Sequence, residues 1–140
     1  MNTQSSNLEL PSSILRLLDA NLNRLREGIR VVEDIRRYCF DDATFAKALK
    51  ELRHKARVEP YITLLQNRNI RNDVLKSTTK SEASRDSLIS LQIASLKRAQ
   101  ESARVLEEAL KLYDTKEAEK FKNIRYELYD IETKLFICES

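Results

Sequence analysis

The chain has 140 residues, about one domain, and its 25 basic and 22 acidic residues leave a formal net charge of +3. Its single glycine, Gly28, and two prolines argue against a many-turned β-sandwich and exclude the glycine-rich phosphate loops, which each need at least two glycines. The mixed charge argues against a nucleic-acid-binding stripe, and no apolar run approaches the roughly 18 residues of a membrane span.

The cysteines and the N-terminus indicate the compartment. Cys39 and Cys138 form neither a metal-binding pattern nor a disulfide framework. The first residues lack the basic and apolar regions of a signal peptide. We therefore expect a cytoplasmic protein that has no nucleic-acid or membrane partner.

Residues 1–11 are polar and without periodicity, and we expect them to form a flexible tail. Ser12 or Ser13 can cap a helix after Pro11. From there to about Cys39, apolar residues recur at steps of three and four, which predicts a helix with one apolar face. The residues of this stripe are Leu15, Leu18, Leu22, Leu25, Ile29 and Val32.

A second helix is expected after Asp41 or Asp42, either of which can cap it. Its apolar stripe consists of Phe45, Leu49, Leu52 and Ala56. Pro60 predicts a break or kink, which is followed by a helical continuation over residues 61–66. The sequence then loses its periodicity over residues 68–81, which predicts the longest loop of the chain.

The third helix is expected to begin at Ser81 and Glu82 and to end near Tyr113, and the fourth to begin at Asp114 or Thr115. Their stripes are Leu88, Leu91, Leu96, Ala99, Ala103, Leu106 and Leu110, and then Phe121, Ile124, Leu128, Ile131 and Leu135. Four long helices with short connections inside each pair predict an all-α antiparallel bundle.

The two halves of the chain also match each other. Residues 19–34 align without a gap with residues 93–108, and the identical pairs include Leu22/Leu96, Arg24/Arg98, Glu27/Glu101, Arg30/Arg104, Val31/Val105 and Glu33/Glu107. Farther along, Leu52-Arg53-His54 matches Ile124-Arg125-Tyr126. We interpret the match as two repeated helical hairpins in a single domain, residues 12–67 and 82–138, related by a pseudo-two-fold axis.

Arg24 and Arg98 mark the candidate site. On a helical wheel each falls inside an apolar sector, where an unpaired guanidinium would be costly. In one interpretation Arg24 pairs with Glu27 or Glu101 in a structural ion network, and Gly28 only allows two helices to cross closely. In the other, the two arginines bind phosphate between the helices, because guanidinium groups suit phosphate, and the two glutamates hold Mg²⁺.

Further residues have side chains suited to phosphate chemistry. His54 can act as a base or as a phosphate partner, although the matched residue is Tyr126. Asp73 offers a carboxylate in the predicted loop, and Glu82 and Arg85 stand near a helix start, where phosphate also binds. The ordinary alternatives are a surface histidine, a solvated linker and a helix cap.

Four segments of the sequence resemble a known family. They are LLDANLNRLREGIRVVEDIRRYCFDD, LKELRH, SLKRAQESARVLEEALKL and FKNIRYELYDIE. They resemble the small helical domain found alone or fused ahead of thiamine-phosphate synthase, a type commonly labelled thiamine-phosphate pyrophosphorylase-like. The resemblance covers nearly the whole chain after residue 13, and its most specific part is DANLNRxREGxRVVED.

The resemblance implies a protein of thiamine biosynthesis that binds or phosphorylates hydroxymethylpyrimidine phosphate. As a kinase, unrelated to the ribokinase-like enzyme for that step, it would use Mg²⁺ and ATP. The alternative is a non-catalytic helical module that binds a ligand or a protein and is associated with thiamine-phosphate synthase. The implied partners are a small phosphorylated pyrimidine, thiamine-phosphate synthase and a second copy of the chain. Thiamine-phosphate synthase itself is a TIM barrel of about 200 residues or more, which this chain is too short to form.

The resemblance also selects site residues. It places Asn21, Arg24, Glu27, Arg30 and Glu33, with Arg98, Glu101, Arg104 and Glu107, in the family's signature helices. Together with the repeated placement of these residues, this predicts phosphate binding by Arg24, Arg98, Arg30 and Arg104 and carboxylates for metal or substrate from Glu27, Glu101 and Asp73. We expect supporting roles for Asn21, Gly28, Glu33, His54, Glu82 and Arg85. In the family, an Asp-Val-Gly sequence precedes a threonine or serine in the linking loop. Here Leu75 follows Asp73 and Val74, a departure that counts against phosphate binding by this loop.

Overall fold

The computed structural model describes residues 10–58 and 87–137, and every regular element in these ranges is helical. The order is α1 (Ser12–Asp34), the π-helical η2 (Ile35–Cys39), α2 (Ala43–Lys55), α5 (Leu88–Leu110) and α6 (Thr115–Phe136). The predicted all-α bundle of four helices is thus confirmed. The predictions for Pro60, the continuation at 61–66, the loop at 68–81 with Asp73, the start at Ser81 and Glu82, Arg85 and Cys138 lie outside the described residues.

The first helix reaches the predicted residue but begins and ends in unexpected ways. Pro11, not Ser12 or Ser13, is the N-cap residue, and no side chain caps the helix. The carbonyl of Pro11 accepts hydrogen bonds from the first turn instead, so the two serines are simply helical. The helix widens at its end into the π-helical turn η2, which ends at Cys39.

Aspartate and serine side chains set the other helix starts. Asp42 accepts a hydrogen bond from the backbone of Phe45 at the start of α2, and Asp114 caps α6, both among the predicted caps. The helix α5 is capped by Ser87 and begins at Leu88. The side chain of Ser87 takes the capping role because its own backbone is extended.

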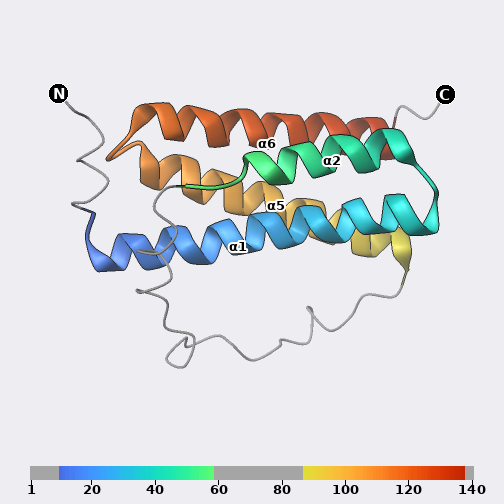
Figure 1. Ribbon diagram of the computed structural model, residues 1–140, viewed down its shortest axis with the longest axis horizontal. Helices are drawn as coiled ribbons and strands as arrows, with labels where there is room; N and C mark the ends of the chain where they lie inside the picture. The colour runs from blue at the N-terminus through green and yellow to red at the C-terminus, as the bar shows by residue number, and fades with distance from the viewer. Residues whose placement is uncertain (1–9, 59–86, 138–140) are drawn as a thin grey trace.

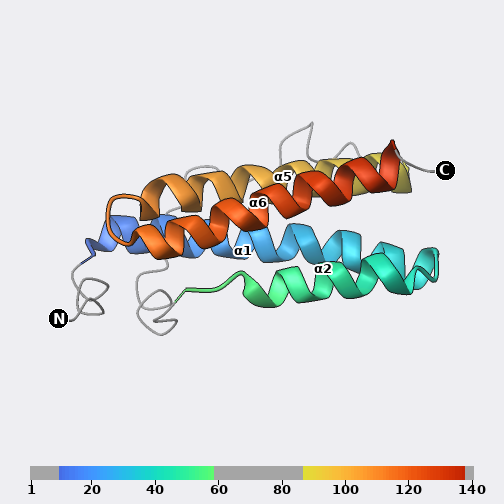
Figure 2. The same ribbon diagram turned by 90° about the horizontal axis from the view of Figure 1, so that it is seen from above.

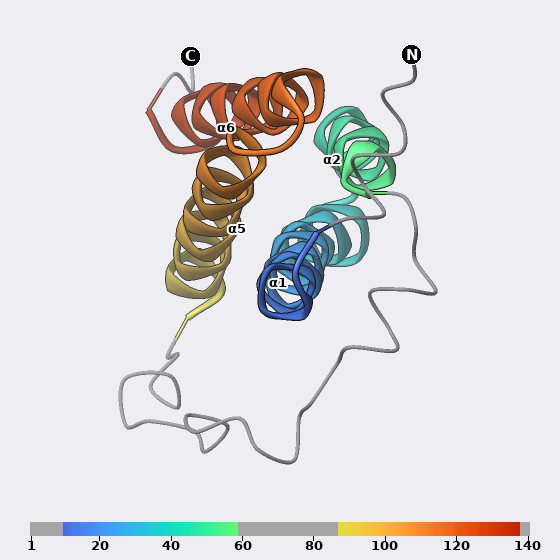
Figure 3. The same cartoon turned by 90° about the vertical axis from the view of Figure 1, so that its left-hand side faces the viewer.

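The helices α1 and α5 run side by side in opposite directions and form the centre of the fold (Figures 1 and 2). The helix α2 packs on α1, and α6 packs on α5, whereas α2 and α6 make few contacts with each other (Figure 3). The two hairpins therefore meet mainly through α1 and α5.

The predicted stripes supply most of the core. Leu88, which the sequence placed in the stripe of the third helix, is instead 44% exposed. Among the side chains without exposed surface are Leu18, Leu25, Ile29, Val32, Leu49, Leu96, Leu106, Phe121 and Leu128. Leu10, which belongs to the predicted tail, is also buried in this cluster. No helix in the described part of the chain is long and apolar enough to cross a membrane.

The single glycine lies at a close contact between the two central helices. A Cβ atom on Gly28 would stand 2.9 Å from the carbonyl oxygen of Ser95 and 3.3 Å from the Cβ of Ala99. The distance to the carbonyl oxygen of Ser95 is too short for a Cβ atom, and this oxygen belongs to the backbone of α5, so it cannot move aside as a flexible side chain could. The structure thus explains Gly28 by close helix packing, one of the two roles that the sequence left open.

Candidate functional site

Each hairpin contains a buried ion pair between its two helices. In the first, Arg53 of α2 binds Glu33 of α1 through Nε–Oε1 at 2.7 Å and Nη2–Oε2 at 3.1 Å. In the second, Nη2 and Nε of Arg125 on α6 donate to Oε1 of Glu107 on α5 at 2.8 and 3.1 Å. All four side chains are at most 12% exposed. These pairs occupy matched positions of the two halves.

Hydrogen bonding holds both guanidinium groups in their charged form. The pKa of Arg125 is raised, chiefly by its hydrogen bond with Tyr129 and then by Glu107. The hydrogen bond with Glu33 likewise raises the pKa of Arg53. Glu33, which the family resemblance gave a supporting role, is thus occupied in joining α1 to α2.

Two of the four predicted phosphate-binding arginines are exposed and paired along their own helices. Arg30 binds Asp34 at 3.3 Å, and Arg104 binds Glu108 at 3.1 Å. Hydrogen bonding to Lys111, and to a lesser extent to Arg104, lowers the pKa of Glu108. The structure does not bring Arg30 and Arg104 to the cleft described next.

A cleft of about 390 Å³ lies between α1 and α5. Its lining residues are Asn21, Arg24, Arg98, Glu101, Ser102 and Val105. Four of them, Asn21, Arg24, Arg98 and Glu101, were candidates from the sequence, and they come from both hairpins. The fold therefore gathers residues that lie more than seventy positions apart in the chain.

The arginines of this cleft differ from the prediction in two respects. Both Arg24 and Arg98 are exposed, and Val105, which lines the same cleft, is 37% exposed. Within residues 10–58 and 87–137 neither forms an ion pair, so the structural network of Arg24 with Glu27 or Glu101 is absent there. Two exposed guanidinium groups share one cleft, available to an anion.

Two buried polar side chains accompany the arginines. Asn21 is 4% exposed, and its Nδ2 donates to the carbonyl oxygen of Leu17 at 3.0 Å. Ser102 is 3% exposed, and its hydroxyl makes no hydrogen bond to any residue that the structure describes. The cleft thus combines cationic donors with a buried hydroxyl and a buried amide.

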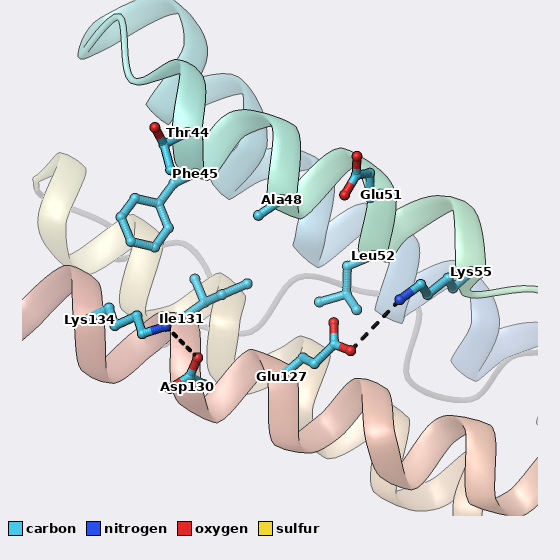
Figure 4. Close-up of a pocket in the computed structure, with 10 residues that line it drawn as sticks. All are labelled: Thr44, Phe45, Ala48, Glu51, Leu52, Lys55, Glu127, Asp130, Ile131 and Lys134. Atoms are coloured by element: carbon cyan, nitrogen blue, oxygen red, sulfur yellow. Dashed lines mark ion pairs between the residues drawn. The ribbon is translucent and has the colours of Figure 1, made fainter.

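A second groove, of about 410 Å³, separates α2 from α6 (Figure 4). Phe45, Leu52 and Ile131 point into it between the two helices. Its two lysines already have partners, since Lys55 binds Glu127 at 3.7 Å and Lys134 binds Asp130 at 3.0 Å. This groove is as large as the α1–α5 cleft, but its cations are already neutralised.

The remaining sequence candidates lie elsewhere. His54 is exposed on α2, and Glu27 is exposed on α1; neither lines the cleft. Asp73, Glu82 and Arg85 fall outside the described residues. Within the described ranges, no group of three histidine, cysteine, aspartate or glutamate side chains is placed to hold a metal ion.

The sequence did not identify Arg53 and Arg125 as the arginines that pair with glutamates inside the hairpins. Their signal was present in two separate matches, Glu33 with Glu107 and Arg53 with Arg125. A helical wheel treats one helix at a time, and so it could not join a glutamate on one helix to an arginine on the next.

Comparison with known proteins places these observations in a family. A model of the ThiD2 family matches residues 16–134, which include all four helices almost completely. No solved structure matches this chain.

Curated relatives are longer proteins. The chain is 39% identical over 126 residues to thiamine-phosphate synthase of Synechocystis, covering 89% of this chain and 37% of the relative. It is 34% identical to thiamine-phosphate synthase of Nostoc sp., with 94% and 38% covered, and 36% identical to that of Rhodopirellula baltica, with 84% and 32% covered. The chain thus spans about a third of the length of these relatives.

Proposed function

Because the chain belongs to the ThiD2 family, we propose that it acts in thiamine biosynthesis and binds hydroxymethylpyrimidine phosphate in the α1–α5 cleft. The observation that carries this proposal is a pair of guanidinium groups, Arg24 and Arg98, that face one cleft from α1 and α5 and form no ion pair with the described residues. Guanidinium groups bind phosphate through paired N–H donors. The relatives' name, thiamine-phosphate synthase, supports the assignment to thiamine chemistry.

We propose that the reaction is phosphoryl transfer from ATP to the bound phosphate, which yields the diphosphate. Such a transfer forms a P–O bond to the substrate phosphate and breaks the bond between the β- and γ-phosphates. It depends mainly on positioning and charge neutralisation. Arg24 and Arg98 would hold and orient the acceptor phosphate, and the hydroxyl of Ser102 would donate to one of its oxygens.

The donor set of the cleft fits Mg²⁺ only in part. Mg²⁺ is usually held by one or two carboxylates together with phosphate oxygens and water, and among the described residues Glu101 is the one carboxylate that lines the cleft. Mg²⁺, when bound, neutralises charge on the transferring group. The protein would contribute Glu101 to that site and the substrate phosphates would contribute the remaining oxygens.

The test is a binding and turnover assay with matched arginine variants. Hydroxymethylpyrimidine phosphate is titrated calorimetrically, and the diphosphate is sought after incubation with ATP and Mg²⁺. We expect Arg24→Ala and Arg98→Ala each to weaken binding at least about tenfold, because a charged hydrogen bond contributes about 1.5–3 kcal/mol. Arg16→Ala removes an exposed arginine of the same helix outside the cleft and should change neither result.

Helical circular dichroism of each variant separates binding from folding. If Arg24→Ala loses its helical signal, Arg24 is structural and the proposed role is wrong. If the wild type binds no hydroxymethylpyrimidine phosphate, the proposed function is wrong.

The same assay distinguishes a second candidate, a non-catalytic module associated with thiamine-phosphate synthase. The observation that favours it is the short span of the chain, which covers 37% of the Synechocystis relative. A module of this kind would bind the pyrimidine phosphate through the same arginines without producing the diphosphate. Production of the diphosphate would exclude it.

A further inference from the structure

We propose that Asn21 determines the specificity of the α1–α5 cleft by accepting a hydrogen bond from an amino group of the ligand. The inference rests on the proposed function, since it assumes that phosphate is held by Arg24 and Arg98. The class of ligand that it selects is a phosphate ester of an amino-substituted aromatic ring. A simple phosphate would satisfy the arginines but would leave Asn21 without a donor.

The orientation of the Asn21 amide follows from its one hydrogen bond. The carbonyl oxygen of Leu17 can only accept, so the atom 3.0 Å from it must be the NH₂ group of Asn21. This argument settles the choice between nitrogen and oxygen that is otherwise an inference for asparagine. The carbonyl oxygen Oδ1 is therefore the acceptor that the side chain has left to offer.

The surroundings of Oδ1 leave it available to a ligand. Asn21 is 4% exposed and lines the cleft, and nothing in the described part of the chain donates to its Oδ1. A ligand that covers Oδ1 without donating to it would take this acceptor out of water unpaired, which costs free energy. The side chain is thus prepared to distinguish ligands that bring a donor from ligands that do not.

The spacing on α1 suits a ligand that touches both groups. Positions 21 and 24 lie three residues apart on a helix, so their Cβ atoms are about 5–6 Å apart. In hydroxymethylpyrimidine phosphate, the amino group is on the ring carbon beside the one that carries the phosphate-bearing arm. A single molecule can place its phosphate on Arg24 and its amino group on Asn21.

The corresponding position of the second half suggests a mild substitution. Ser95 stands on α5 where Asn21 stands on α1, and it is 5% exposed. Asn21→Ser therefore introduces a residue that the same type of helix–helix interface already contains. Asn23→Ser is a matched control, because Asn23 is on the same helix, is half-buried and does not line the cleft.

The experiment compares three ligands by calorimetric titration of the full chain. They are hydroxymethylpyrimidine phosphate, its analogue with methyl in place of the amino group, and inorganic phosphate. We expect the wild type and Asn23→Ser to prefer the amino compound over the methyl analogue at least about tenfold, because a site built to hydrogen-bond a group rejects the analogue that lacks it. Asn21→Ser should reduce this preference to about threefold or less, with little change for inorganic phosphate.

The outcomes separate the two proposals. If Asn21→Ser keeps the full preference while it folds normally by circular dichroism, the specificity role is wrong and the phosphate site stands. Equal binding of the amino and methyl compounds by the wild type overturns the specificity role in the same way. If none of the three ligands binds the wild type, the proposed function fails, and the inference fails with it.

Discussion

Two pairs of arginines occupy matched positions in the two halves of the chain, yet the fold treats them in opposite ways. Arg53 and Arg125 lie inside their hairpins, each bound to a buried glutamate. Arg24 and Arg98 lie between the hairpins, exposed and without ion pairs among the described residues. A repeated arginine in a helical protein can thus be structural or available, and only its contacts distinguish the two.

The largest expected effect comes from breaking an internal pair. Arg125→Met should destabilise the fold by about 3–5 kcal/mol, because it leaves the charge of Glu107 buried without its main partner. Lys111 stands 3.7 Å from the same carboxylate, which favours the lower end of this range. The free energy of unfolding is measured by urea titration followed by circular dichroism.

The matched variant tests the other half of the comparison. Arg24→Ala should change the free energy of unfolding by no more than about 0.5 kcal/mol, as expected for an exposed side chain that forms no ion pair with the described residues. Similar losses in Arg125→Met and Arg24→Ala would contradict the distinction between structural and available arginines.

A loss of stability smaller than that of Arg125→Met is expected at the contact between the hairpins. Gly28→Ala should destabilise by about 1 kcal/mol, because overpacking costs about 1–3 kcal/mol and the better helix propensity of alanine returns about 1 kcal/mol. The new Cβ would stand 2.9 Å from backbone that cannot simply rotate away. The variant should also weaken phosphate binding, since separation of α1 and α5 moves Arg24 away from Arg98.

A graded series serves as the control for this prediction. Gly28→Val should cost more than Gly28→Ala, because its two additional carbons need still more room. A raised melting temperature for Gly28→Ala would contradict the prediction, because it would show that α1 and α5 make room for the new Cβ without loss of stability.

One substitution is expected to have the opposite sign and to stabilise the fold. Gln92 is fully buried, its Nε2 donates to Leu88, and its Oε1 has no partner among the described residues. Leu18 is one residue before the aligned segment and corresponds to Gln92, and it too is fully buried. Gln92→Leu should therefore stabilise the fold by about 1–2 kcal/mol, because it removes an unsatisfied buried acceptor. The urea midpoint should increase.

Gln100 provides the comparison for Gln92. It is 4% exposed, but its Nε2 donates to Glu132 at 2.9 Å, so Gln100→Leu should destabilise by about 1 kcal/mol. If both leucine variants shift stability in the same direction, hydrogen-bond satisfaction is not what separates these two glutamines.

Much of the fold could be predicted from the sequence, because burial repeats with the period of the helix. Leu18, Leu25 and Ile29 were placed on one face by spacing alone, and all are fully buried. Caps were harder to predict. Asp114 was correctly predicted as the cap of α6. The N-cap residue of α1 is Pro11, whose backbone is extended and whose carbonyl accepts from Ile14 and Leu15, and no side chain caps this helix. Local propensity does not determine which of several suitable residues takes the cap.

The site was only partly predictable. Matching Arg24 with Arg98 identified the cleft, because both positions face the same helix–helix junction. Their exposure was predicted wrongly, since the wheel of one helix does not show which flank a neighbouring helix covers. Arg30 and Arg104 matched equally well in the sequence but pair along their own helices. The interpretation of the match as a duplication stays a prediction from the sequence.

The position of the cleft links ligand binding to the cohesion of the fold. One wall belongs to α1 and the other to α5, and these helices form the main contact between the hairpins. An anion bound by both arginines would connect α1 to α5 and so stabilise the contact between the two hairpins while it is bound. At a concentration one hundred times its dissociation constant, such a ligand adds about 2.7 kcal/mol to the stability of the native state. The thermal midpoint of the protein is then itself a reporter of what the cleft accepts.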